Sequence, residues 1–185
     1  MLTTTLPPRA ITHQEAIVRA IVKTFELSVE DLEALQRGGS RPLEKLVRSY
    51  HYWATEYNGG ICPYDHPRLG YFRMTERAAK HDGATKELHC EHIVPVKWIV
   101  TELMRIRKEE DRPPTTVRVA NLMTVNEIII VMKDEARQMD RHGRSTMPLD
   151  WRPPRSHLVR LENCLQIAET QLIGVRLIGP VASAA

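Results

Sequence analysis

Aromatic residues are scarce in this chain, at 5% of 185 residues, and there are only three cysteines. The low aromatic content argues against a nucleic-acid-binding protein that stacks bases on a platform of exposed rings. An odd number of cysteines without paired spacing does not predict a disulfide framework. No apolar run reaches the roughly 18 residues of a membrane-spanning helix, and the first residues lack the profile of a signal peptide. We therefore expect a soluble, cytoplasmic protein.

Negative charge is slightly outnumbered by positive charge, and the net charge is +3. Residues 1–60 carry seven Lys/Arg and seven Asp/Glu, whereas residues 61–185 carry nineteen and sixteen. The positive excess therefore lies in the second part of the chain, where it is compatible with a phosphate-backbone partner. With 42% hydrophobic residues, a chain of this length can bury one good core.

The first 60 residues have the pattern of a helical region. Apolar side chains recur at helical spacing between Ala16 and Phe25, and Thr12 begins a capping-box sequence before them. Further helices are expected over 28–38 and from residue 42 to about residue 58. We expect this region to form one compact unit with the remainder of the chain.

The second part of the chain alternates between strand and helix patterns. Three consecutive isoleucines and a valine in 127–132 are β-branched residues, which favours a buried strand. The other expected elements are strands at 87–94 and 171–178, and helices at 73–80, 96–109, 117–125, 133–141 and 156–169.

The segment Glu91-His92-Ile93-Val94-Pro95 sets a carboxylate beside an imidazole at the end of an apolar strand. Adjacent side chains on a strand point to opposite faces, so Glu91 and His92 share a neighbourhood only if the chain bends there, and Pro95 favours such an exit. The segment resembles the first element of the HNH, or ββα-metal, endonucleases. In that family an acidic residue binds a divalent metal and the following histidine activates water.

The resemblance covers about residues 87–141 and implies an α+β fold. Its centre would be a small ββα-metal core of two strands and a helix, to which a C-terminal strand could be added. The implied organisation is a helical N-terminal region at 1–60 and an HNH-like nuclease core with basic loops at 61–185.

The resemblance also implies roles for individual residues. His92 would be the general base, and Glu91 would hold Mg²⁺ or Mn²⁺ through its oxygens. An asparagine just before the second strand positions the histidine in this family. Asn121 and Asn126 are both candidates, and we prefer Asn126 because the strongest strand pattern follows it directly.

The third family element is a metal ligand in the closing helix, about nine residues beyond the asparagine. Counting from Asn126 gives Glu135, with Asp134 adjacent to it. The family most often carries His or Asn at this place, so this chain either uses an acidic variant or has a degraded metal site. Alternatively, both carboxylates only stabilise the start of the helix through its dipole.

The function implied is a metal-dependent endonuclease that hydrolyses phosphodiester bonds in DNA, as in restriction, phage defence or mobile-element processing, with the metal stabilising the leaving 3′-oxygen. A double-strand cutter with one such site per chain would act as a homodimer. The basic residues expected to bind backbone phosphates are Arg73, Arg77, Lys80, Lys133, Arg141, Arg144, Arg152 and Arg155.

Three alternatives remain open. The chain could be a non-catalytic nucleic-acid-binding or regulatory protein on a decayed HNH scaffold, or an adaptor whose first sixty residues dock a partner protein. A structural Zn²⁺ could join Cys62 and His66, four residues apart, with His89 and Cys90. Adjacent His89 and Cys90 are an awkward pair of ligands for one ion, and Cys90 also suits a buried strand position.

Overall fold

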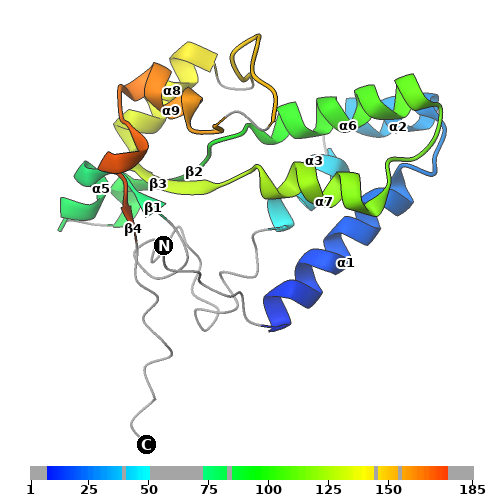
Figure 1. The fold of residues 1–185 in the computed structure, drawn as a ribbon, viewed down its shortest axis with the longest axis horizontal. Coiled ribbons are helices and arrows are strands. Elements are labelled where there is room, and N and C mark those ends of the chain that lie inside the picture. The colour runs from blue at the N-terminus through cyan, green and yellow to red at the C-terminus, as the bar shows by residue number, and fades with distance from the viewer. Residues whose placement is uncertain are drawn as a thin grey trace, which may run out of the picture. The chain divides into compact units, whose positions relative to one another are not determined.

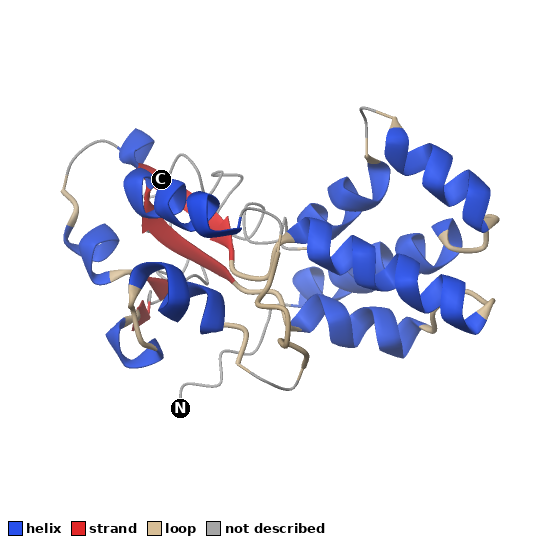
Figure 2. Cartoon of the chain, turned by 90° about the horizontal axis from the view of Figure 1, so that it is seen from above, coloured by secondary structure: helices blue, strands red, loops and turns tan. Residues whose placement is uncertain are grey.

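The computed structural model describes residues 8–38, 41–50, 73–82, 85–143, 146–153 and 156–174. The chain forms two compact units: Met1–Trp53 with Val96–Thr124, and Ala54–Pro95 with Val125–Ala185. In the described residues the first unit is built of helices, and the second contains all the strands (Figure 2). The fold is therefore α+β, as predicted. The boundary predicted at residue 60 lies outside the described residues.

The helical unit buries one apolar face of each of its helices. Ser28 caps one of them, because its Oγ accepts a 3.1 Å hydrogen bond from the backbone N–H of Asp31. Thr12 is not an N-cap, since its helix already begins at Pro8. None of the described helices is long and apolar enough to cross a membrane. The elements of this unit are α1 (Pro8–Thr24), α2 (Val29–Arg37), α3 (Pro42–Ser49), α6 (Val96–Glu110) and α7 (Thr116–Thr124) (Figure 1).

The strand unit contains a four-stranded mixed sheet in the order β2-β3-β1-β4. Strand β3 pairs antiparallel with β2 and parallel with β1, and β1 pairs antiparallel with β4. Helix α8 follows β3 directly and packs on both β2 and β3. The elements of this unit are β1 (Arg73–Met74), α5 (Glu76–Lys80), β2 (Leu88–His92), β3 (Ile128–Met132), α8 (Lys133–Gly143), α9 (Val159–Leu165) and β4 (Ile173–Gly174), with 3₁₀ turns at Thr85–Glu87 and Glu169–Gln171.

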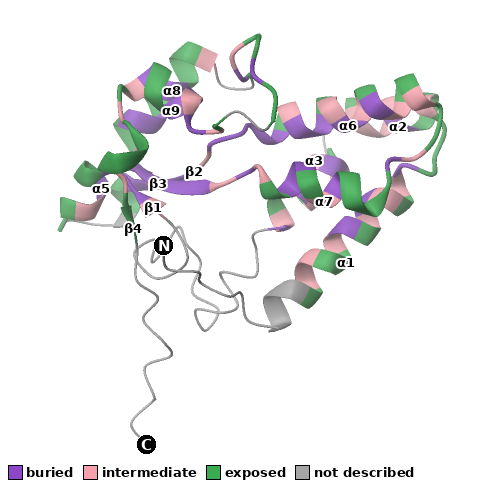
Figure 3. Cartoon of the chain, viewed as in Figure 1, coloured by how far each residue is buried: buried purple, intermediate pink, exposed green. Residues whose placement is uncertain are grey.

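Strand β3 is the centre of the core in this unit. Its first four residues are buried, as Figure 3 shows. Ile129 and Val131 pack with Ala136 and Met139 of α8 and with apolar residues of α9. This confirms the predicted β-branched strand. The helix predicted over 73–80 is wrong at its start, because Arg73 and Met74 pair with β3 and α5 begins only at Glu76.

Candidate active site

The register of β2 on β3 determines which way Glu91 and His92 point. Glu91 is opposite Ile129, His89 is opposite Val131, and His92 is opposite Ile128. Residues directly opposite in an antiparallel pair share a face of the sheet, and neighbours along a strand alternate. Glu91 and His89 therefore lie on the face that α8 and α9 cover, whereas His92 lies on the other face. Glu91 and His92 can therefore contact the same bound group only at the end of β2.

Glu91 is engaged by two side chains. Arg160 of α9 donates a 2.7 Å hydrogen bond from Nη1 to its Oε1, and His89 Nε2 lies 3.3 Å from its Oε2. The side chain of Glu91 is 14% exposed and that of Arg160 is 3% exposed. Burial alone would raise the pKa of Glu91, but His89 and Arg160 outweigh it, so the pKa is below its ordinary value. Glu91 is thus ionised and pairs with the buried guanidinium of Arg160.

Arg160 also holds the main chain of the predicted catalytic residue. Its Nη1 donates a second hydrogen bond, of 3.1 Å, to the backbone oxygen of His92. One nitrogen therefore links the Glu91 carboxylate to the end of β2. Sequence reasoning did not predict this role, because 69 residues separate Arg160 from Glu91 and no local pattern marks the contact.

Asn126 lies just before β3, next to the end of β2. The backbone N–H of Ile93 donates a 2.9 Å hydrogen bond to the backbone oxygen of Glu127. This bond continues the pairing of β2 with β3 past His92 towards Asn126. Asn126 is 4% exposed, and neither its Nδ2 nor its Oδ1 has a hydrogen-bond partner among the described residues. A buried amide without partners is costly and calls for an explanation. Asn121, the rejected candidate, is exposed within α7 of the helical unit.

The structure places Glu135 and Asp134 at the opposite end of the strand pair. Glu135 Oε2 accepts 2.8 Å hydrogen bonds from the Met132 backbone N–H and from Thr75 Oγ1. Met132 is paired with Leu88, three residues from Glu91, a separation of about 10 Å along a strand. Two oxygens that share Mg²⁺ each lie about 2.0–2.1 Å from the ion. The predicted set of Glu91 with Glu135 and Asp134 therefore does not fit one metal ion.

Glu135 instead stabilises the start of α8. Its bond to the Met132 N–H satisfies a donor that the first turn of a helix leaves free. Asp134 accepts a 2.8 Å hydrogen bond from Arg77 Nη2, and Arg77 Nη1 lies 3.6 Å from Glu135 Oε1. These contacts agree with the alternative interpretation, in which Glu135 and Asp134 stabilise the start of the helix.

No group of three or more His, Cys, Asp or Glu side chains within the described part of the chain is placed to hold a metal ion. For the zinc alternative, Cys62 and His66 lie outside that part. Cys90 is buried and opposite Ile130, on the face away from His89. The adjacent His89 and Cys90 therefore point to different faces of the sheet.

Several residues predicted to bind nucleic acid have protein partners. Arg73 forms two 2.5 Å hydrogen bonds to Glu127 and one of 2.8 Å to Glu169. Lys80 pairs with Glu76, and Arg152 donates to the backbone oxygen of Trp151 at 2.6 Å. Arg144 and Arg155 lie outside the described residues. Lys133 and Arg141 are exposed on α8.

Glu127 is a second half-buried carboxylate that sequence reasoning did not single out as a site residue. Besides Arg73, His157 donates a 2.7 Å hydrogen bond to its Oε2. Burial alone would raise the pKa of Glu127, but the hydrogen bonds from Arg73 and His157 lower it to about 2. Each of the two carboxylates, Glu91 and Glu127, is thus tied to a residue in or just before α9. The position of Glu127 beside Asn126 was the only feature of the sequence that could have marked it as a site residue.

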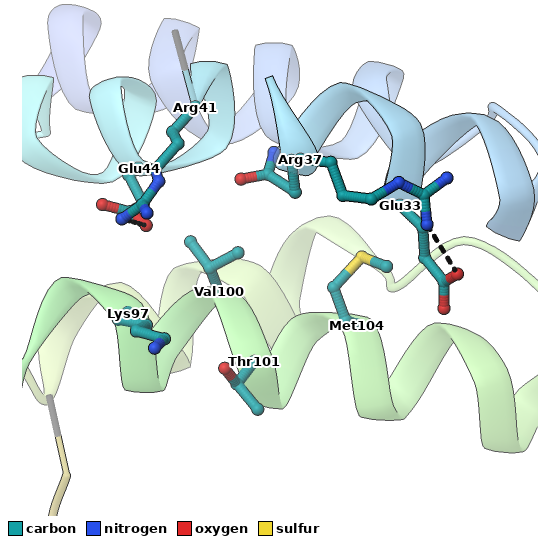
Figure 4. Close-up of a pocket in the computed structure, with 9 residues that line it drawn as sticks. Glu33, Arg37, Arg41, Glu44, Lys97, Val100, Thr101 and Met104 are labelled. Atoms are coloured by element: carbon teal, nitrogen blue, oxygen red, sulfur yellow. Dashed lines mark hydrogen bonds and ion pairs between the residues drawn. The ribbon is translucent and has the colours of Figure 1, made fainter. Parts of the chain in front are cut away.

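The helical unit has a groove of about 400 Å³ that α2, α3 and α6 line (Figure 4). Val100 and Met104 supply apolar surface, and two ion pairs lie along the lining, Glu33 with Arg37 at 3.8 Å and Glu44 with Arg41 at 3.4 Å. The groove carries charges of both signs, with Glu33 and Glu44 beside Arg37, Arg41 and Lys97.

No protein-family model matches the chain, and no curated protein or solved structure matches it significantly. The functional argument therefore rests on the residues and their geometry.

Proposed function

We propose that the strand unit is an HNH-type endonuclease that hydrolyses phosphodiester bonds in DNA, with His92 as the general base. The observation that carries the proposal is Asn126, a buried amide whose polar atoms have no partner among the described residues, beside the strand end that holds His92. A catalytic role is one of the reasons for which proteins keep such unsatisfied groups. The order of two antiparallel strands and a helix packed on both also supports a ββα core.

In the proposed reaction His92 accepts a proton from a water molecule while the water oxygen bonds to phosphorus. An imidazole is suited to this step because its unperturbed pKa, about 6.5, leaves much of it neutral near pH 7. The bond between phosphorus and the 3′-oxygen breaks, and the 3′-oxygen takes a proton from solvent, which leaves a 3′-hydroxyl and a 5′-phosphate. Asn126 positions His92 and is not itself a proton acceptor.

The resemblance to HNH enzymes implies Mg²⁺ or Mn²⁺ at Glu91. The predicted partners Glu135 and Asp134 lie at the other end of the strand pair, and both oxygens of Glu91 already face Arg160 or His89. The residues therefore do not fit the predicted metal set, and our proposal assigns no step to the metal.

Nicking of a supercoiled plasmid by the full chain, with Mg²⁺, Mn²⁺ or EDTA present, tests the function. We expect His92→Ala to lose nicking by at least about 100-fold, the usual contribution of a general base. His81→Ala, a half-buried histidine directly after α5, is the matched control and should keep most of the rate. Equal nicking by His92→Ala and the wild type would overturn the proposal.

A second candidate is a non-catalytic nucleic-acid-binding protein on the same scaffold. The buried Glu91–Arg160 pair favours it, because an internal cation occupies the carboxylate that the family uses for metal. This candidate predicts DNA binding without nicking under any of the metal conditions above.

A further inference from the structure

A cavity of about 260 Å³ lies in the strand unit, beside the starts of α5 and α8 and the end of α9. This volume far exceeds the roughly 10–15 Å³ that holds one water molecule. Leu165 and Ile167 give the cavity an apolar wall, and both also pack against the core of the unit. The other lining residues carry polar groups: Thr75, Glu76, Arg77, Glu135, Gln138 and Gln171.

The buried charged group in the cavity wall is the carboxylate of Glu135, a residue that is 4% exposed. Its Oε2 is fixed by the hydrogen bonds from the Met132 N–H and from Thr75. Its Oε1 accepts no hydrogen bond from the described residues and, unlike the partnerless atoms of Asn126 and Arg160, it is not closed off from solvent. A buried carboxylate oxygen without a donor is costly, so Oε1 is expected to accept a hydrogen bond from a group in the cavity.

Arg77 determines which kind of donor suits this oxygen. Its Nη1 lies 3.6 Å from Glu135 Oε1, which is too far for a hydrogen bond but close enough to offset the negative charge. Its Nη2 donates to Asp134, and Glu76, the other acidic residue of the lining, pairs with Lys80. Each carboxylate at the cavity thus already has a cation beside it. The cavity therefore favours a neutral N–H donor over a metal ion or an ammonium group.

Two glutamine side chains of the lining are held in one orientation by the main chain. Gln138 Nε2 donates a 2.7 Å hydrogen bond to the backbone oxygen of Cys164, and Gln171 Oε1 accepts one of 2.7 Å from the backbone N–H of Ala168. Gln138 therefore keeps its Oε1 as an acceptor, and Gln171 keeps its Nε2 as a donor. Together with Glu135 Oε1, the cavity offers two acceptors and one donor next to an apolar wall.

We propose that this cavity binds an unstacked nucleobase that carries an exocyclic amino group, which is adenine, cytosine or guanine. The amino group has two N–H donors, which suit Glu135 Oε1 and Gln138 Oε1, and a neighbouring ring acceptor suits Gln171 Nε2. Thymine lacks the amino group and cannot supply both donors. The assignment of the base to a nucleic-acid substrate rests on the proposed function, whereas the site itself rests on Glu135 and the two fixed amides.

The site is tested without any measurement of cleavage. The ¹⁵N-labelled full chain is titrated with deoxyadenosine, deoxycytidine, deoxyguanosine and thymidine, which carry no phosphate, while NMR follows the side-chain amides of Gln138 and Gln171. We expect saturable shifts with at least one of the three amino nucleosides. Thymidine should bind at least about tenfold more weakly than that nucleoside, because it leaves a charged acceptor without its donor. Propionamide, an analogue of a glutamine side chain, is titrated in parallel.

Variants separate a built site from unspecific binding of nucleosides. Gln138→Ala removes an exposed side chain and one acceptor, and should weaken binding about fivefold, as expected for one neutral hydrogen bond. Arg137→Ala removes the neighbouring exposed side chain of α8, which does not line the cavity, and should leave binding unchanged. Glu135→Gln should weaken binding at least tenfold, and Gln138→Ala still tests the site if that variant does not fold.

Unsaturable shifts, equal binding of thymidine and the amino nucleosides, or equal effects of Gln138→Ala and Arg137→Ala would overturn the base site. Propionamide binding as tight as that of the nucleosides would also overturn it, in favour of an amide side chain of a partner protein. Failure of the site is distinguishable from failure of the proposed function. Base binding in a protein that never nicks DNA sinks the function alone, whereas His92-dependent nicking without nucleoside shifts sinks the base site alone.

Discussion

The buried Arg160 and the half-buried Glu91 form an ion pair, with 2.7 Å between Nη1 and Oε1, across 69 residues of sequence. The pair fixes α9 to the edge strand that carries the candidate catalytic histidine. The same guanidinium contacts the oxygen of His92. Arg160 is therefore the residue that connects α9 with the sheet and with the predicted active site.

Removal of one partner of this pair should destabilise the protein strongly. Glu91→Ala leaves the Arg160 charge buried without its counter-ion, which typically costs about 3–5 kcal/mol. Urea unfolding, followed by the fluorescence of the buried Trp151, measures the loss. Glu76→Ala breaks the exposed pair with Lys80 and should change the midpoint little. Similar midpoints for the two variants would contradict the pair's role.

Asn126→Ala should separate function from stability. The amide has no partner among the described residues, so its removal should change the free energy of unfolding by less than about 1 kcal/mol, whereas loss of a bonded buried amide costs about 1–3 kcal/mol. If Asn126 positions His92, nicking should fall at least tenfold in the same variant. A destabilised variant with unchanged specific activity would show that Asn126 is structural.

Acid should weaken the strand unit through Glu127. Its pKa is about 2 when folded and near 4.5 as a free side chain. A lowered folded pKa gives stability that is present above pH 4.5 and is lost as the pH falls towards 2, by up to about 3 kcal/mol. Unfolding of the wild type and of Glu127→Gln is measured from pH 6 to pH 2.5. The difference in their stability should shrink over this range, and a constant difference would contradict the assignment.

The exposed cations of α8 should bind DNA phosphates, whereas Arg77 should not. Lys133→Ala and Arg141→Ala are each expected to weaken DNA binding and to lower the slope of log affinity against log salt by about 1. Arg77 is held by Asp134, so Arg77→Ala should have a smaller effect. Fluorescence anisotropy at several salt concentrations measures all three. An equal loss for Arg77→Ala would mean that its ion pair opens to bind DNA.

Local patterns in the sequence predicted most of the elements. The β-branched run of β3 and the helical spacing of α6 needed only neighbouring residues, and both elements lie where they were expected. The short strand β1 was missed because Arg73 and Met74 are extended only through pairing with residues more than 50 positions away.

The candidate site was predictable only where it is local. The Glu91-His92 segment and Asn126 do lie at one end of the strand pair. Glu135 was chosen by counting residues, which takes no account of the antiparallel register that places it at the other end. Arg160 could not be found in this way, because its importance comes from tertiary contacts with Glu91 and His92.

The most direct test of the central claim is chemical rescue of His92→Gly. Plasmid nicking by the folded variant is measured with and without added imidazole, and circular dichroism confirms its fold. If His92 is the general base, the variant loses at least about 100-fold in rate, and imidazole restores part of the loss because it can occupy the space of the missing ring. Wild-type nicking without imidazole, or no recovery with it in a folded variant, would contradict the claim.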